Sequence, residues 1–131
     1  MPQIESTLSL VNCKEILEAG KSRYIAAAFG ADDFTADFEV YRSESDKELD
    51  FARKWFALCC HAYGVVSIDT PYVQFKDPKG LQKQLDYLKS IGIKAKFAIH
   101  PTQIDPINAT FGVSNQEFEY YSRMVAVFEK A

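Results

Sequence analysis

Apolar runs and amphipathic segments alternate along the chain. Four short, nearly continuous apolar runs are typical of buried strands, and they lie near residues 2–5, 24–29, 65–69 and 95–99. Between and after these runs, apolar residues recur every three or four positions, which predicts helices. The helical segments are residues 10–22, 43–64, 77–92 and 114–131, with a short helix or turn over 102–112.

End signals support these helices. Ser45 with Glu48, and Ser114 with Glu117, have the three-residue spacing of a capping box, in which each residue hydrogen-bonds the backbone of the other. Asp77 is the expected N-cap of the helix over 77–92. Glycines stand at the expected helix stops, at Gly20, Gly64 and Gly92.

Strand–helix alternation predicts a parallel sheet with right-handed crossovers, and thus an α/β fold. Parallel strands are covered on both faces, which explains why the apolar runs show no alternation. We expect four parallel strands, with helices covering one face of the sheet.

Composition narrows the class of protein. The chain has 131 residues, suited to one domain, with 47% hydrophobic and 25% charged residues and a net charge of -3. A mildly acidic surface argues against nucleic acid as a partner, and no apolar run is long enough to span a membrane. The N-terminus shows no targeting peptide. The cysteines, at 13, 59 and 60, lack zinc-ligand spacing and indicate structural thiols in a reducing compartment.

Chemically capable side chains follow each predicted strand. Glu5 ends the first run, Asp32 and Asp33 the second, Asp69 the third and His100 the fourth. In α/β folds this edge is where ligands bind, although each acid alone is also a common turn or cap residue. Glu5 and Asp33 on neighbouring strand ends would repel each other unless a cation lay between them.

Several stretches carry a family resemblance: "IES", "FGADDF", "DFARKWFALCCHAYGVVSIDTPYVQFKDPKGL" and "KFAIHPTQI". In this order they resemble the C-terminal half of the HpcH/HpaI aldolase and citrate lyase beta-subunit superfamily, in particular its citrate lyase beta-like (citramalyl-CoA lyase) members. The resemblance implies a TIM barrel that uses Mg²⁺ to make or break a carbon–carbon bond beside a CoA thioester, such as citramalyl-CoA, malyl-CoA or citryl-CoA, releasing a keto acid.

The resemblance also assigns residues. Glu5 and Asp33 match the family's metal ligands, and Gly30, Ala31 and Asp32 match the turn that holds the substrate carboxylate. A supporting or CoA-facing role is implied for three further residues: Asp69, His100 and Pro101. No residue matches a catalytic group. The resemblance further implies a homo-oligomer, which is a trimer in relatives. It also implies a mitochondrial location, as in the animal members. Because no targeting peptide is visible, the cytoplasm is the alternative location.

Departures from the family pattern define the expected architecture. Four strand–helix units make a partial (β/α)8 barrel, since a closed barrel needs eight units and about 250 residues. The family's early-strand arginine and C-terminal-tail aspartate have no counterpart, which suggests a truncated product, an isoform or an incomplete gene model. We expect residues 1–131 to form one C-terminal half-barrel domain. Its inward side chains, or those alternating with them, would then face solvent; the candidates are Ala26, Ala28, Phe97 and Ile99.

Two other interpretations remain open. A half-barrel without catalytic function could associate with itself or with a full-length relative, because its two edge strands would be exposed. A phospho-receiver domain would also use adjacent acids at one strand end, Asp69 at another and Lys96 nearby, but it needs a doubly wound strand order.

Overall fold

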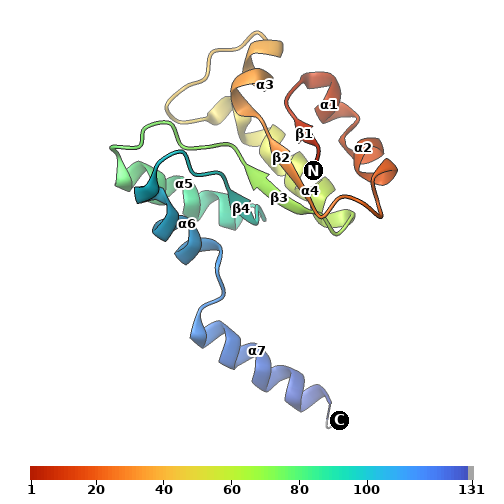
Figure 1. The fold of residues 1–131 in the computed structure, drawn as a ribbon, viewed down its shortest axis with the longest axis vertical. Coiled ribbons are helices and arrows are strands. Elements are labelled where there is room, and N and C mark those ends of the chain that lie inside the picture. Colours follow the sequence, from red (N-terminus) through yellow and green to blue (C-terminus); the bar gives the residue numbers. More distant parts are fainter. Residues whose placement is uncertain (130–131) are drawn as a thin grey trace.

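A computed structural model describes residues 1–129 and contains one parallel sheet (Figure 1). Its four strands lie in consecutive order, β1-β2-β3-β4, and every neighbouring pair is parallel. The strands are β1 (Gln3–Ile4), β2 (Ala26–Phe29), β3 (Val66–Asp69) and β4 (Ala95–Lys96). The predicted α/β fold with four parallel strands is therefore confirmed. The consecutive order also differs from that of a doubly wound receiver domain.

Helices follow the strands. They are α1 (Thr7–Val11), α2 (Cys13–Ala19), α3 (Ala31–Asp37), α4 (Asp50–Ala62), α5 (Pro78–Ser90), α6 (Ile104–Phe111) and α7 (Asn115–Phe128), with short 3₁₀ turns η1 (Lys47–Leu49) and η2 (Pro101–Gln103). In the described part of the chain, no helix is long and apolar enough to cross a bilayer.

Helix end signals were mostly predicted correctly. Ser114 and Glu117 form the expected capping box, and Asp77 accepts a hydrogen bond from the Gly80 N–H. The capping box of Ser45 with Glu48 was wrong. The Glu48 carboxylate instead accepts hydrogen bonds from the backbone N–H and the hydroxyl of Ser43, both at 2.7 Å.

The last strand is shorter than the expected run over 95–99. Regular strand pairing ends at Lys96, although the Phe97 N–H still donates to the Asp69 carbonyl at 3.1 Å. His100 therefore lies four positions beyond the strand end rather than on it. The physical reason is that β4 is an edge strand of the described sheet and has a partner on one side only.

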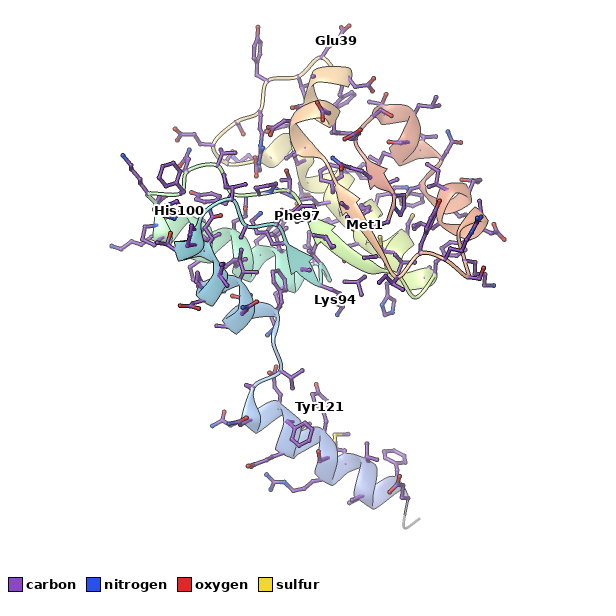
Figure 2. The ribbon with its side chains drawn as sticks, viewed as in Figure 1. Met1, Glu39, Lys94, Phe97, His100 and Tyr121 are labelled. Atoms are coloured by element: carbon purple, nitrogen blue, oxygen red, sulfur yellow. The ribbon has the colours of Figure 1, made fainter. Side chains whose placement is uncertain are left out.

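One face of the sheet carries the main core. Ile4, Phe29 and Val65 pack there with buried residues of α2, α4 and α5. On the other face Val66 is 44% exposed and Phe97 is 37% exposed (Figure 2). The expected exposure of apolar side chains is thus seen for Phe97 and for Ile99, which is 55% exposed.

Ala28 corrects that expectation, because it is fully buried. Its register partners are Gln3 on β1 and Ile68 on β3, so larger side chains flank its methyl group on both sides. Ala26, at the start of the same strand, is only partly buried. A small side chain in an inner strand is thus shielded by the sheet itself.

The three cysteines are free and buried, as expected of structural thiols. Cys13 on α2 belongs to the same core cluster as Cys59 and Cys60 on α4. Burial raises the pKa of the Cys60 thiol to about 12, which keeps it protonated and unreactive near neutral pH.

Helix α7 differs from all the others, because none of its residues is buried. It projects from the body beyond α6 and carries Tyr121 (Figures 1 and 2). The apolar stripe that predicted this helix is exposed along its length; its members are Phe118, Tyr121, Val125 and Phe128.

Candidate functional site

Glu5 and Gly30 lie side by side at the carboxyl edge of the sheet. They directly follow Ile4 and Phe29, which are register partners, and the Gly30 N–H donates to the Ile4 carbonyl at 2.9 Å. A Cβ atom at Gly30 would lie 2.8 Å from the Glu5 Cβ and 3.1 Å from its Oε2. Glycine is needed here because the Glu5 side chain occupies that space.

Gly30 is also the N-cap of α3, a helix that the sequence analysis missed. Asp32 and Asp33 are not turn residues but stand in the first turn of this helix. No side chain caps the helix, and its first internal hydrogen bond is from the Phe34 N–H to the Gly30 carbonyl. The N–H groups of Ala31 and Asp32 therefore remain free of helical partners at a positive helix end.

The carboxylates of Glu5 and Asp33 differ from most acids at this edge. Neither takes part in an ion pair among residues 1–129, and Asp33 is exposed while Glu5 is partly buried. Two free carboxylates suit Mg²⁺, which usually takes one or two protein carboxylates and completes its octahedron with water and substrate. Within those residues no group of three or more His, Cys, Asp or Glu could hold a metal. A shared Mg²⁺ between Glu5 and Asp33 stays a prediction.

Asp69, for which a supporting or CoA-facing role is expected, lies among buried cations. Its side chain is fully buried and points to the helix-covered side of the sheet. Arg53 of α4 donates to both of its oxygens, at 2.8 and 3.2 Å, and Lys96 of β4 donates to Oδ2 at 2.9 Å. Asp69 is therefore saturated by two buried cations, and its supporting or CoA-facing role stays a prediction.

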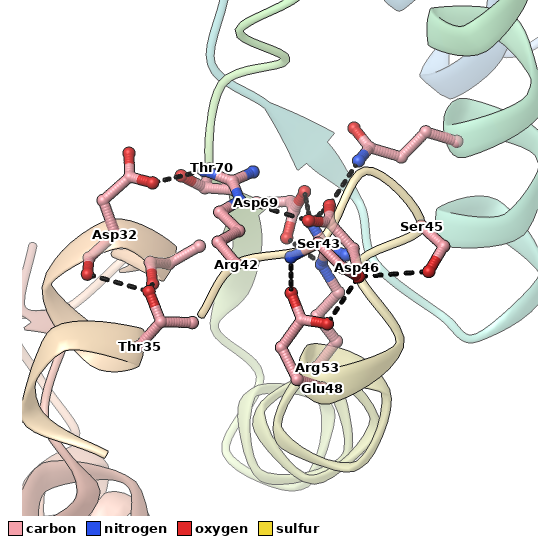
Figure 3. A network of polar contacts seen from close by, with 12 residues as sticks. Asp32, Thr35, Arg42, Ser43, Ser45, Asp46, Glu48, Arg53, Asp69 and Thr70 are labelled. Carbon is pink, nitrogen blue, oxygen red and sulfur yellow. Dashed lines mark hydrogen bonds and ion pairs between the residues drawn. The ribbon is translucent and has the colours of Figure 1, made fainter. Parts of the chain in front are cut away.

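The ion pairs continue from Arg53 toward the start of α3 (Figure 3). Arg53 also donates to Asp46 Oδ2 at 3.0 Å, and Asp46 Oδ1 accepts from Arg42 at 3.1 Å. Arg42 then reaches Asp32 Oδ1 at 2.6 Å. We call this alternating series the ion-pair chain; its members are Asp32, Arg42, Asp46, Arg53, Asp69 and Lys96.

The pKa shifts follow the balance of burial and charge in this chain. Burial would raise the pKa of Asp46, but the hydrogen bond from Arg42 and the charge of Arg53 outweigh it, so the pKa lies below its usual value. Burial lowers the pKa of Lys96 despite the neighbouring Asp69 carboxylate. Equal numbers of opposite charges make the series neutral, which is the condition for placing it in the interior.

His100 and Pro101 lie in the η2 turn, beyond the sheet edge. His100 is its N-cap, and its Nδ1 accepts from the Thr102 N–H at 3.3 Å. The ring stacks on Phe75, with centroids 5.0 Å apart. Among the described residues no hydrogen bond or ion pair links His100 to Glu5 or Asp33, and its supporting or CoA-facing role stays a prediction.

A cavity of about 570 Å³ opens between α4 and α5. Its lining residues include Asp50, Tyr72, Lys83, Gln84 and Tyr87. Gln84 donates from Nε2 to Asp46 at 2.7 Å, and its buried Oε1 has no hydrogen-bond partner among the described residues. The volume is within the range of ligand pockets.

Arg53 is the site residue that the sequence could have disclosed. It stands on the buried stripe of α4, four positions after Leu49 and three before Phe56, both fully buried. A cation on an apolar stripe needs a buried acid, and Asp69 at the next strand end was available. Arg42 gave no such signal, because it lies in an irregular segment between α3 and η1.

Comparisons with known proteins agree with this geometry. The family model described as HpcH/HpaI aldolase/citrate lyase matches residues 1–101. Citrate lyase subunit beta of Leuconostoc mesenteroides subsp. cremoris is 30% identical over 131 residues, covering 100% of this chain and 43% of its own. Human mitochondrial citramalyl-CoA lyase is 28% identical over 137 residues, covering 99% of this chain and 40% of its own. The chain thus spans less than half of either relative.

Solved structures show the same fold. RipC from Yersinia pestis superposes with a TM-score of 0.80 at 32% identity, covering 88% of this chain and 53% of its own. CitE from Mycobacterium tuberculosis, solved with magnesium, acetoacetate and coenzyme A, superposes with a TM-score of 0.76 at 21% identity. That match covers 98% of this chain and 49% of the other.

Proposed function

Because the chain belongs to the HpcH/HpaI aldolase/citrate lyase family, we propose that it contributes to a magnesium-dependent lyase for hydroxy-acyl-CoA thioesters. The reaction cleaves a carbon–carbon bond, or forms it in reverse, between a keto acid and an acyl-CoA. Citramalyl-CoA, malyl-CoA and citryl-CoA are the substrates of choice. One observation carries the proposal: the Glu5 side chain lies against Gly30, at an uncapped helix start that also bears Asp33.

We place these residues on part of a (β/α)8 barrel. Four consecutive parallel strands with helices against one face are half of the eight units that such a barrel contains. The carboxyl edge of the strands, where Glu5 and Gly30 lie, is the edge at which barrel enzymes bind their substrates. This architecture explains why Val66 and Phe97 are exposed on the opposite sheet face, which faces the interior of a complete barrel.

Glu5 and Asp33 would hold the metal, each through a carboxylate that is free of ion pairs in the described structure. Bound Mg²⁺ would polarise the keto or hydroxy oxygen next to the substrate carboxylate. Gly30 lets the Glu5 side chain approach the start of α3 closely. The two ligands would thereby come from two different segments of the chain, the end of β1 and the first turn of α3.

The start of α3 would bind the substrate carboxylate. Backbone N–H groups of Ala31 and Asp32 have no helical acceptor, and the helix end is positive, so an anion is favoured there. The substrate carboxylate would be fixed in this position, next to the oxygen at which charge develops. We assign no general base, since His100 lies in the η2 turn and has no hydrogen bond to these residues in the described structure.

A second candidate function has its own support. The exposed apolar side chains on the uncovered sheet face, together with the edge strands β1 and β4, suit a non-catalytic half-barrel that pairs with itself or with a full-length relative. A homo-oligomer, such as a trimer, fits either candidate. A mitochondrial location is proposed from human citramalyl-CoA lyase, whose name includes that organelle.

Calorimetry can test the lyase proposal with pyruvate, the keto acid that citramalyl-CoA cleavage releases. We expect pyruvate to bind the purified chain only with Mg²⁺, and Glu5→Gln or Asp33→Asn to weaken Mg²⁺ binding at least tenfold. Glu15→Gln, which removes an exposed carboxylate on α2, is the matched control and should bind as the parent does. Equal Mg²⁺ binding by the parent and the three variants would refute the site. If the chain also self-associates but binds no pyruvate, the second candidate is favoured.

A further inference from the structure

Asp46 combines features that a surface loop does not require. It is a non-glycine residue with φ of 52° and ψ of 25°, in the left-handed region that costs side-chain-bearing residues of order 1 kcal/mol. It is 8% exposed, and its carboxylate accepts hydrogen bonds from Arg42, Arg53 and Gln84. These three donors come from different segments, so Asp46 fixes the irregular segment before η1 to both α4 and α5.

Arg42 is the residue that this fixed segment presents. Its Nε donates to Asp46 at 3.1 Å while NH1 donates to Asp32 at 2.6 Å. The Arg42 side chain is 16% exposed, whereas that of Asp32 is 70% exposed. Arg42 therefore connects a buried anchor to the first turn of α3, where the free N–H groups lie.

Helix α3 needs such an external support. It has seven residues, and no side chain caps its N-terminus. Short helices derive little stability from their own hydrogen bonds and depend on tertiary contacts. Asp37 ties its last turn to Thr7, through hydrogen bonds of 2.7 and 2.6 Å. Arg42 provides the corresponding tie at the first turn.

We propose that Arg42 is a positioning residue, which holds the first turn of α3 in its anion-binding orientation and is itself anchored by the strained Asp46. Its effect on substrate rests on the proposed function; its effect on α3 does not. Arginine suits this role because its planar guanidinium donates in two directions at once, from Nε and NH1. A lysine would present all its donors from a single nitrogen atom and lacks this fixed two-sided geometry.

Amide hydrogen exchange followed by NMR tests the proposal without relying on catalysis. In Arg42→Gln we expect exchange in α3, at residues 34–37, to accelerate about threefold to fivefold, the upper part of the range for losing a partly exposed ion pair. Exchange in β3 and the middle of α4 should stay within twofold. Arg42→Lys should fall between Arg42→Gln and the parent. Lys54→Gln, which removes an exposed ion pair with Asp50 on α4, is the matched control.

Asp46→Gly separates anchoring from backbone shape. Glycine adopts positive φ freely but has no carboxylate, so this variant keeps the turn and removes the anchor. We expect it to reproduce the accelerated α3 exchange of Arg42→Gln at temperatures well below its unfolding transition. Parent-like α3 exchange in either Arg42→Gln or Asp46→Gly would overturn the proposal.

Pyruvate affinity in the presence of Mg²⁺ is the second measurement. A positioning role predicts that pyruvate affinity weakens about threefold to fivefold in Arg42→Gln, with a smaller change in Mg²⁺ affinity alone. Absence of pyruvate binding by the parent would refute the proposed function, while the exchange data would still decide the role of Arg42. If the parent binds pyruvate and Arg42→Gln binds it equally well, Arg42 does not position the site, and the proposal is overturned.

Discussion

The carboxylates near the carboxyl edge of the sheet fall into two groups, which differ in whether protein cations neutralise them. Asp46 and Asp69 are buried and receive hydrogen bonds from cations that are themselves buried or nearly so. Glu5 and Asp33 lie at the same edge and take part in no ion pair within residues 1–129. The first group satisfies its charge inside the protein, and the second leaves it available.

This difference separates stability from ligand binding. A buried carboxylate is tolerated only with partners, so removing one member of the ion-pair chain leaves the opposite charge unpaired. A carboxylate without protein partners contributes little to folding and can be removed cheaply. Removing a carboxylate of the first group should therefore lower the free energy of unfolding strongly, whereas removing one of the second group should change it little.

The largest expected effect is that of Asp69→Ala on stability. It leaves Arg53 and Lys96 buried without their shared acceptor, which should lower the free energy of unfolding by about 3–5 kcal/mol. Urea denaturation measures this loss. Asp33→Ala is the counterpart from the second group, and it should change the free energy of unfolding by about 0.5 kcal/mol or less. Equal losses of unfolding free energy in the two variants would show that the two groups of carboxylates do not differ in their contribution to stability.

Acid should act through the first group, and Asp46 gives the sign. Its pKa is lowered in the folded protein, so the unfolded chain binds its proton first as pH falls. The resulting stability is fully present above about pH 4, the usual range for an aspartate, and is lost as pH falls through the lower folded pKa. Asp46→Asn should flatten the dependence of unfolding free energy on pH below about pH 4. A slope equal to that of the parent would show that Asp46 is not linked to acid unfolding.

Gly30→Ala probes the second group and should lower the free energy of unfolding much less than Asp69→Ala does. The added Cβ would lie 2.8 Å from the Glu5 Cβ, so the Glu5 side chain must move. We expect a loss of about 1 kcal/mol in unfolding free energy with a clear loss of Mg²⁺ affinity. Combining Gly30→Ala with Glu5→Gly removes the clash, so the stability losses should not add. Full additivity would mean that the two side chains do not compete for space.

Sequence reasoning was reliable for most local signals, although the capping box of Ser45 with Glu48 was an exception. The helix over 77–92 was found because Asp77, the residues after it and Gly92 act within one segment, and Gly92 indeed has φ of 90°. Parallel strands were found from their apolar runs. The helix α3 was missed because its seven residues include adjacent acids, which also suit a turn.

The site was harder to predict, because side-chain direction depends on tertiary structure. A strand that is apolar on both faces shows no alternation of apolar and polar residues. The sequence of residues 65–69 therefore does not reveal toward which face of the sheet Asp69 points. The sequence shows Asp69 only as one of several strand-end acids, and its partners in the ion-pair chain come from the structure. Arg42 could not be found at all, since its role depends on the backbone conformation of Asp46.

Because helix α7 is not packed on the core, it should lose its helical structure separately from the rest of the chain on heating. It has 14 residues and buries none of them, which is near the length at which isolated helices are only marginally formed in water. Its helicity therefore rests on its capping box and on the Glu119–Arg123 pair, at 3.8 Å, rather than on the core. We expect the body to unfold in one cooperative transition, while α7 should gain and lose helical turns gradually with temperature, as a helix–coil equilibrium does. Circular dichroism of the whole chain consequently sums a sigmoidal and a sloping component.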